Sequence, residues 1–214
     1  MSQALSAVAV AAPLVAGWSV HSLWFRRRIE RARRDPLTGL LTRELFESRA
    51  RKLAHGGAVA VVVIDLDRFK QLNDTHGHAA GDAMLQATGR RLIESVRRPG
   101  AVARLGGDEF AVVFRCTAPS DMDWVLFDLH EALCAPVDFE GRSVRVGASL
   151  GAIWGDARGG VDLSALMRRA DEAMYAAKPT GGWCIADGLA PVMTTTNGRR
   201  TGRPGAAFPA GGAR

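Results

Sequence analysis

Two adjacent acidic residues follow two glycines in the stretch RLGGDEF, residues 104–110. Short apolar runs flank it, which predicts a hairpin turn that carries Asp108 and Glu109 side by side. Acidic residues at a hairpin tip are often simply solvated, but a paired charge also suits a bound cation. Gly106 and Gly107 have no side chains, so a bulky ligand can approach the turn and its backbone N–H groups.

A third carboxylate follows a strand pattern. Residues 58–65, AVAVVVID, form a continuous apolar run, which predicts a buried central strand that ends at Asp65. If the hairpin pairs beside this strand, its tip brings Asp108 and Glu109 next to Asp65. Three converging carboxylates repel one another unless a cation neutralises them, and such hard oxygen ligands favour Mg²⁺ or Mn²⁺ together with a phosphate substrate.

The stretch NDTHGHAAGD, residues 73–82, adds further polar groups. Zinc is one interpretation of His76 and His78, but no third histidine at helical spacing and no soft ligand supports it. A carboxylate can accept both N–H groups on the Watson–Crick edge of guanine, while an Asn amide can meet its acceptor side. Asn73 and Asp82 therefore permit guanine selection.

Alternating helix and strand patterns must position these residues. The predicted helices span 42–55, with Thr42 as the cap, 81–97, 121–133 and 163–177; the predicted strands span 58–65, 101–105, 110–114, 143–154 and 183–186. Strands that alternate with helices, with one tight hairpin among them, predict an α/β domain with a mixed sheet. A chain of 214 residues suits one such domain with appended segments.

The basic charge of the chain lies outside this domain. The net charge is +6, but residues 26–34 contribute +5 and residues 188–214 contribute +4, which leaves −3 on residues 35–187. A mildly acidic domain argues against a nucleic-acid partner. The three cysteines form no CxxC pair, so neither a disulfide framework nor a zinc ribbon is expected, and a reducing cytosol fits.

The amino-terminal segment 4–25 carries no charge and is long enough to cross a bilayer as a helix. A signal peptide would place positive charge before the apolar run, and here the arginines follow it; a buried or dimerising helix is the other alternative. We expect a transmembrane helix within 1–25 and a basic juxtamembrane linker, 26–34, on the cytoplasmic side. Residues 35–187 are then a cytoplasmic domain at the inner membrane, and 188–214 a disordered tail.

These motifs resemble those of GGDEF domains, the diguanylate cyclases. DPLTGLLTR, DLDRFKQLNDTHGHAAGD, RLGGDEF, SLGAIW and ADEAMYAAK occur in the family's order and at close to its spacing, over about residues 35–186. The resemblance implies a fold similar to nucleotidyl cyclase and polymerase palm domains. It also implies that two GTP become cyclic di-GMP and two pyrophosphates in a twofold dimer, each half-site carrying one GTP.

The resemblance further implies roles for single residues. Asp65 and the Leu66 carbonyl match metal ligands, and Asp108 matches a ligand that also accepts the proton of the 3′-hydroxyl. Glu109 matches a position near the metals, with Gly106 and Gly107 against the substrate.

Nucleotide contacts are implied as well. Asn73 and Asp82 match the guanine-reading positions, and His78 a further substrate contact. Lys70 and Lys178 match phosphate-binding lysines.

Two positions depart from the family pattern. After Lys178 the family continues Gly-Arg-Asn, whereas this chain has Gly182 at the Arg position and Trp183 at the Asn position, so a phosphate contact is missing or comes from another residue. The product-inhibition motif Arg-x-x-Asp retains Arg97 but has Gly100 in place of Asp, which predicts weak or absent feedback inhibition.

The sequence therefore predicts a membrane-tethered diguanylate cyclase. Two alternatives remain: a degenerate GGDEF domain that binds GTP or cyclic di-GMP as a receptor, and a scaffold whose Arg-rich segment recruits a partner. A membrane anchor suits a dimeric enzyme because two copies held in one plane have a higher effective concentration.

Overall fold

The computed structural model describes residues 34–96, 99–155 and 162–186, together with Trp18 and His21. Apart from Trp18 and His21, the predicted membrane span lies outside the described residues, and so does the whole of the tail 188–214. Of the basic linker 26–34, only Arg34 is described. Among the described residues, none of the helices combines the length and the hydropathy needed to cross a bilayer.

Five strands form one mixed sheet, in the order β2-β3-β1-β6-β7. They are β1 (Val59–Asp67), β2 (Gly100–Gly106), β3 (Glu109–Arg115), β6 (Gly147–Gly155) and β7 (Gly182–Ile185). Neighbouring strands pair antiparallel except for β6 and β7, which run parallel. The predicted α/β fold with a mixed sheet is confirmed.

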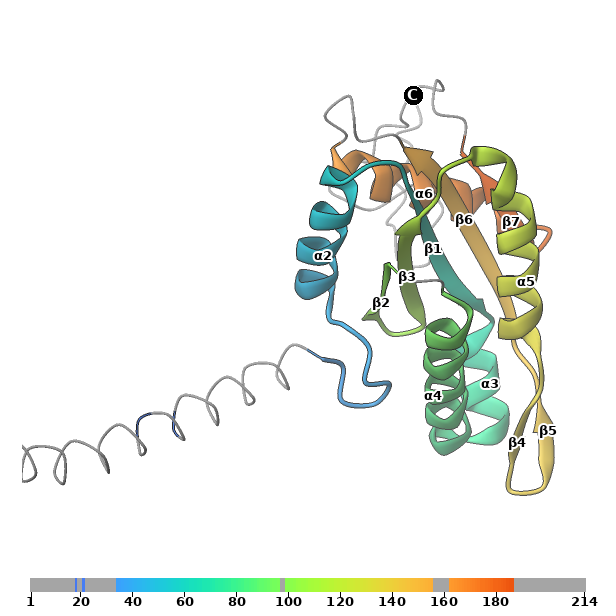
Figure 1. Cartoon of the computed structure of the whole chain (residues 1–214). Coiled ribbons are helices and arrows are strands. Elements are labelled where there is room, and N and C mark those ends of the chain that lie inside the picture. The colour runs from blue at the N-terminus through green and yellow to red at the C-terminus, as the bar shows by residue number, and fades with distance from the viewer. Residues whose placement is uncertain (1–17, 19–20, 22–33, 97–98, 156–161, 187–214) are drawn as a thin grey trace, which may run out of the picture.

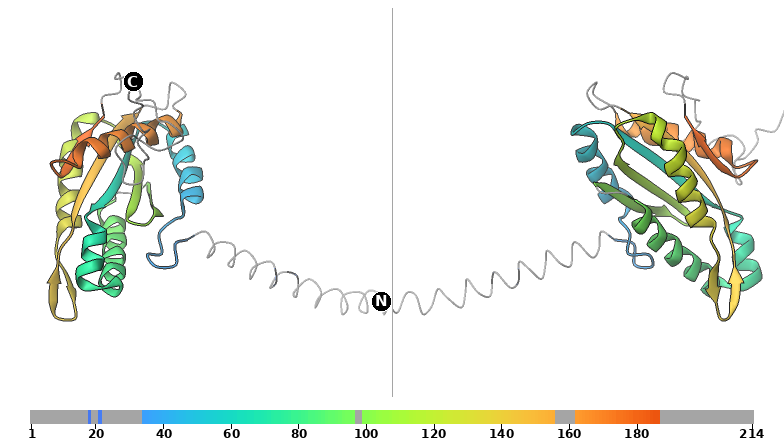
Figure 2. Two further views of the ribbon diagram at one scale, coloured as in Figure 1. Left: turned by 180° about the vertical axis from the view of Figure 1, so that it is seen from behind. Right: turned by 45° about the vertical axis from the view of Figure 1, so that its right-hand side comes forward.

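Helices cover both faces of this sheet (Figures 1 and 2). The helices of the described residues are α2 (Arg43–His55), α3 (Phe69–His76), α4 (His78–Ser95), the 3-10 helix η1 (Pro119–Asp121), α5 (Met122–Cys134) and α6 (Leu163–Ala177). Helices α4 and α5 pack on one face, and α2 and α6 pack on the other. A separate hairpin, β4 (Val137–Phe139) with β5 (Arg142–Val144), extends beyond α5 (Figure 1).

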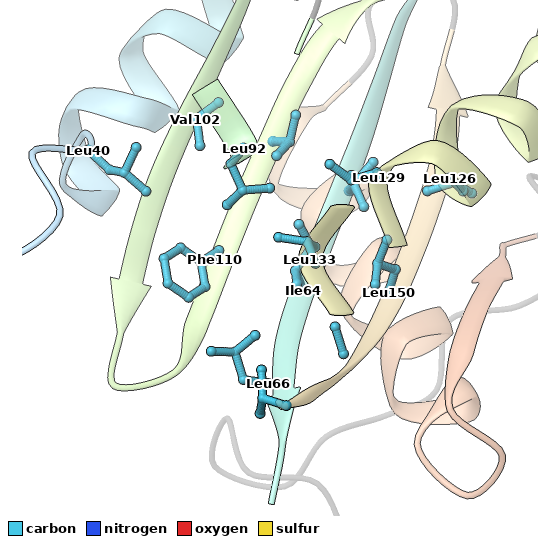
Figure 3. Close-up of a cluster of buried hydrophobic side chains, with 14 of the residues drawn as sticks. Leu40, Ile64, Leu66, Leu92, Val102, Phe110, Leu126, Leu129, Leu133 and Leu150 are labelled. Carbon is cyan, nitrogen blue, oxygen red and sulfur yellow. The ribbon is translucent and has the colours of Figure 1, made fainter. Parts of the chain in front are cut away.

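Strand β1 lies at the centre because both of its faces are buried. Alternate side chains of a strand point to opposite faces. Ile64 and its alternate neighbours pack toward α4 and α5, while Val61 and Val63 pack toward α2 and α6. Figure 3 shows the first layer, in which Ile64, Phe110 and Leu150 of the sheet face Leu92, Leu126, Leu129 and Leu133 of the helices. A continuous apolar run is what a strand buried on both faces requires.

The prediction missed helix α3. Arg68 alone separates it from β1, in the left-handed conformation with φ of 55°. The chain therefore turns sharply without the glycine or proline that normally marks such a break. The next helix was predicted from residue 81 but begins at His78, after Gly77 with φ of 85°.

The predicted long strand 143–154 is wrong at its start. Residues Arg142–Val144 belong to β5, and β6 begins only at Gly147. Glu140 and Gly141, with φ of 52° and 73°, form the turn that folds β5 back on β4. Thr42 does occupy the N-cap of α2, but its side chain makes no cap hydrogen bond.

Gly151 lets α6 approach the sheet closely. A β-carbon at this position of β6 would collide with the backbone nitrogen of Met174 and the carbonyl oxygen of Ala170. The contacting side of α6 is correspondingly small, with buried Ala170, Ala173 and Ala177. Lys178 directly follows the last residue of this helix.

We expect Gly151→Ala to lower the free energy of unfolding by about 1–3 kcal/mol, because the added methyl meets backbone atoms that cannot rotate away. Chemical denaturation would measure the change. Gly155→Ala is the matched control, since its methyl would meet only the flexible Leu166 side chain, at 3.0 Å and beyond. Equal stability of the two variants would contradict the proposed helix–sheet contact.

Candidate active site

The β2–β3 hairpin brings its acidic residues to the end of β1. Glu109 is the cross-strand partner of Asp65, and the Leu66 N–H donates to the Asp108 carbonyl oxygen at 3.2 Å. The hairpin therefore pairs beside the central strand, which is the condition under which the sequence brings these acidic residues next to Asp65. Figure 1 shows this turn at the same end of the sheet as α3 and α4.

Asp65 forms an ion pair with Lys178. Asp65 is only 7% exposed. The Lys178 Nζ lies 2.8 Å from the Oδ1 atom of Asp65. Lys178 follows the last residue of α6, so the close packing of α6 on the sheet places this ammonium group. A buried carboxylate needs such a partner, because desolvation penalises an unpaired charge. Lys178, which the family resemblance matches to a phosphate-binding lysine, thus lies beside the Asp65 carboxylate.

Asp108 is half-buried in the same place. Burial raises the pKa of its carboxyl group, the nearby charge of Asp65 raises the pKa further, and Lys178 opposes both. Glu109 acts more weakly on this pKa. In the part of the chain that the structure describes, no three His, Cys, Asp or Glu side chains come together as a metal-binding group. The expected cluster of three carboxylates is therefore not found, and a lysine–carboxylate pair stands beside Asp108 instead.

The donor set at this place is nevertheless made of hard oxygens. It comprises the carboxylates of Asp65 and Asp108 and the backbone carbonyl of Leu66, which follows Asp65 in β1. The negative charge of Asp65 raises the pKa of Asp108, because the two carboxylates repel each other. A divalent cation would neutralise both charges, so this pair is a suitable environment for one.

The backbone conformation of the turn favours glycine at both Gly106 and Gly107. Gly106 and Gly107 have φ of 150° and 54°, which side chains disfavour. A β-carbon at either position would meet nothing within 4 Å, so the turn is open on its outer side. A cavity of about 670 Å³ lies there, lined among others by Arg43, Glu44 and both glycines. The sequence predicted the open approach but not the backbone requirement.

Helices α3 and α4 bring the predicted guanine-reading region together. The Asn73 amide packs against Gly81, where any β-carbon would collide with it. Asn73 Oδ1 is buried and has no hydrogen-bond partner among the described residues. Asp82 follows Gly81 on α4 and is exposed, as are His78 at the start of that helix and Lys70 on α3.

A second carboxylate fixes the exit from β1. Asp67 Oδ1 accepts a hydrogen bond from the buried Ser149 hydroxyl at 2.7 Å, across the β1–β6 pair. The left-handed Arg68 then starts α3. This arrangement sets the position of α3, and with it Asn73, relative to the end of β1. The sequence analysis assigned no role to Ser149.

Arg104 connects the β2–β3 turn to the start of the domain, a link that the sequence analysis also missed. Its Nε donates to the Gly107 carbonyl oxygen at 2.9 Å, and its NH1 donates to both carboxylate oxygens of Asp35 at 3.2 Å. Asp35 Oδ1 also accepts from the Thr38 backbone and hydroxyl, at 2.8 and 2.6 Å. The pattern Asp-x-x-Thr was the available signal, since it is typical of an Asp-closed turn.

Comparison with known proteins decides the family. Residues 32–183 match the family described as diguanylate cyclase, GGDEF domain. The chain belongs to the GGDEF family. An uncharacterized 19.3 kDa protein of Streptomyces ambofaciens is 44% identical over 163 residues, covering 76% of this chain and 87% of that protein. The diguanylate cyclase DgcP of Pseudomonas aeruginosa is 36% identical over 160 residues, which cover 71% of this chain but only 23% of DgcP.

Solved GGDEF domains have the same fold. The isolated GGDEF domain of YfiN (TpbB) from Pseudomonas aeruginosa superposes with a TM-score of 0.66 at 34% identity, covering 72% of this chain and 94% of that one. The GGDEF domain of DgcB from Caulobacter crescentus, solved in complex with cyclic di-GMP, gives 0.64 at 29% identity, with 72% and 95% covered. This chain is therefore a GGDEF domain related to diguanylate cyclases.

Gly182, which replaces the arginine of the GGDEF family pattern, has a backbone conformation that favours glycine. Gly182 opens β7 with φ of 83°, so an arginine there would be strained. Trp183, the next residue, turns its indole toward α5 and donates from Nε1 to Asp123 at 3.2 Å. Gly100 begins β2, while Arg97 lies outside the described residues.

The Asp35–Arg104 link should make stability depend on pH. Burial alone would raise the pKa of Asp35, but hydrogen bonds from Thr38 and the Arg104 guanidinium hold it below its ordinary value of 3.8. The carboxylate therefore stabilises the fold above that pH, and this contribution is lost as the pH falls through the lowered pKa.

We expect Asp35→Asn to lower the free energy of unfolding by about 1 kcal/mol near neutral pH, and less as the pH falls below 3.8. Denaturation of both proteins across this range would measure the difference. Repeating it in an Arg104→Gln background tests the pair. An unchanged effect of Asp35→Asn there would show that the two side chains do not act together.

Proposed function

We propose that this GGDEF domain is an active diguanylate cyclase that condenses two GTP into cyclic di-GMP and two pyrophosphates. The observation that carries the proposal is the placement of Asp65 and Asp108 together at the end of β1, beside Lys178. GGDEF domains bind GTP or cyclic di-GMP, and that of DgcB was solved with cyclic di-GMP. The residue types at the matched metal and guanine positions are all retained in this chain.

The nucleotide would bind through α3, α4 and the end of α6. Asn73, through its amide N–H₂ donors, and the exposed Asp82 carboxylate would read the edge of guanine, with His78 as a further contact. Lys70 and Lys178 would hold the phosphates. Lys178 would exchange its ion pair with Asp65 for a triphosphate oxygen when GTP binds.

The chemistry would take place between two such nucleotides. GGDEF cyclases generally use Mg²⁺, and here Asp65, Asp108 and the Leu66 carbonyl would hold Mg²⁺ or Mn²⁺. The bound ion supplies a lower pKa for the attacking 3′-hydroxyl and neutralises charge on the α-phosphate. The Asp108 carboxylate would accept the hydroxyl proton, with Glu109 beside it, while the lysines hold the triphosphate for in-line attack.

The reaction requires two copies, because each contributes one GTP. We propose that the protein acts as a homodimer whose segment 4–25 anchors it in the inner membrane, with the GGDEF domain in the cytoplasm. Two copies confined to one plane meet at a higher effective concentration than free copies do.

A receptor function is the second candidate. Gly182 removes the side chain that the family uses beside the phosphates, and Lys178 is held by Asp65. A domain with these features would bind GTP or cyclic di-GMP and report it without forming product.

We expect the full chain to form cyclic di-GMP from GTP and Mg²⁺, and Asp108→Asn to reduce the rate by about 100-fold or more, because the proton acceptor and a metal ligand are lost. Product is measured by chromatography and mass spectrometry. Glu94→Gln, on the exposed side of α4, is the control and should retain activity. Bound GTP without any product would favour the receptor, and full activity of Asp108→Asn would remove this residue from the mechanism.

Asp82→Ala should relax base selection. Without the carboxylate, the guanine N–H donors lose their partner, so the preference for GTP over ATP in binding should fall by about tenfold or more. Competition binding with both nucleotides measures this preference apart from turnover. A variant that still prefers GTP as strongly as the original chain would contradict the role of Asp82.

A further inference from the structure

The outer face of α5 exposes large aromatic side chains. Trp124 is 76% exposed and Phe127 is 47% exposed, one helical turn apart on the same side of the helix. Trp183 of β7 lies beside them, with its ring centroid 6.2 Å from that of Phe127 in an edge-on arrangement. Figure 1 shows α5 and β7 next to each other at one edge of the domain. We call Trp124, Phe127 and Trp183 the aromatic patch.

Contacts with α5 hold Trp183 in its place in the aromatic patch. Trp183 donates from Nε1 to Asp123 Oδ1 at 3.2 Å, and the His130 ring lies 5.8 Å from it, centroid to centroid. Groups of exposed aromatic side chains of this size commonly mark interaction surfaces. None of the residues of the patch has a part in the proposed cyclase chemistry.

The charged residues of η1 and α5 themselves are all acidic, while Arg91 of α4 donates to the carbonyl oxygens of Leu133 and Pro136 at the far end of α5. No lysine or arginine occurs between residues 116 and 134. Four exposed acidic residues flank the patch on η1 and α5, namely Asp121, Asp123, Asp128 and Glu131. Asp128 and Glu131 lie four and seven positions after Trp124, on the same side of the helix. Aromatic faces next to carboxylates are suited to arginine, which stacks on the ring and pairs with the acid.

The chain contains a segment with the complementary composition. Residues 188–214 carry Arg199, Arg200, Arg203 and Arg214 and no acidic residue. This segment follows β7 almost directly, since Ala186 is still fixed to the sheet by a hydrogen bond to Ala152. The stretch from Ala186 to Arg199 can span up to about 40 Å when extended, whereas α5 is about 20 Å long. The arginines can therefore reach the whole patch.

We propose that the arginines of segment 188–214 dock on the aromatic patch of the same chain and pair with the acidic residues of α5. Stacking on Trp124 and Phe127 and ion pairs with Asp128 and Glu131 would hold the segment there. The proposal is independent of cyclase activity, because neither side of the contact includes a residue of the candidate active site.

Photo-crosslinking of the full chain tests this docking. Trp124 is replaced by p-benzoylphenylalanine, which its exposure allows without loss of core packing. Irradiation of a mixture of isotopically light and heavy copies, followed by mass spectrometry, identifies the attached peptide and its copy of origin. We expect attachment to 188–214 of the same copy. The matched control, p-benzoylphenylalanine at the half-exposed Ile93 on α4, should not reach that segment.

Charge variants test the recognition itself. Arg199→Ser with Arg200→Ser and Arg203→Ser should reduce the crosslink about fivefold or more, and Asp128→Asn with Glu131→Gln should do the same, because exposed ion pairs and stacking are both weakened. Unchanged crosslinking in either variant would overturn the proposal. Attachment to the arginines of 26–34, to another copy, or to no part of the chain would overturn it as well.

Discussion

The register between β1 and β3 decides where the chemistry of this domain can take place. Pairing Asp65 with Glu109 sets the β2–β3 turn against the end of the central strand and brings the Asp108 backbone within hydrogen-bonding distance of Leu66. A slip of one residue would move every side chain of one strand to the opposite face. Because β1 is buried on both faces, such a slip would also disrupt both core layers. The packing of the core therefore enforces the geometry of the site.

Opposing charges meet where β1 and β3 are paired in this register. Asp65 and Asp108 are close enough that the charge of one raises the pKa of the other, and Lys178 partly offsets this repulsion. The position of Lys178 depends in turn on Gly151, which allows α6 to lie directly on β6. Close packing on the α2–α6 face of the sheet thus helps to place the positive charge of Lys178 beside Asp65. The same lysine is exposed to solvent although it is paired with the buried Asp65.

One side chain, Arg104, connects the start of the domain to the β2–β3 turn. Arg104 holds the turn at Asp35 with one part of its guanidinium group and the β2–β3 turn with another. Asp35 follows the Arg-rich segment directly. The hydrogen bonds of Arg104 therefore connect Asp35 with the β2–β3 turn. The planar, multidentate guanidinium suits such a bridge better than a lysine would.

Much of this protein could be predicted from local patterns. The apolar run before Asp65, the two apolar runs around GGDE and the periodicity of 163–177 gave a mixed α/β sheet with nearly correct elements, because each pattern records which faces are buried. The family resemblance followed from motif spacing. The left-handed Arg68 and the turn at Glu140 were missed, since neither position carries the residue type usual for its backbone conformation.

The sequence by itself determined the fold class, the family and the set of candidate residues, since these depend on residue types and their spacing along the chain. Only the tertiary structure decided which of those residues meet. The Asp65–Lys178 ion pair, the Arg104–Asp35 link and the meeting of Trp183 with Phe127 each join residues more than fifty positions apart. Such contacts depend on strand register and helix packing, which local sequence patterns do not record.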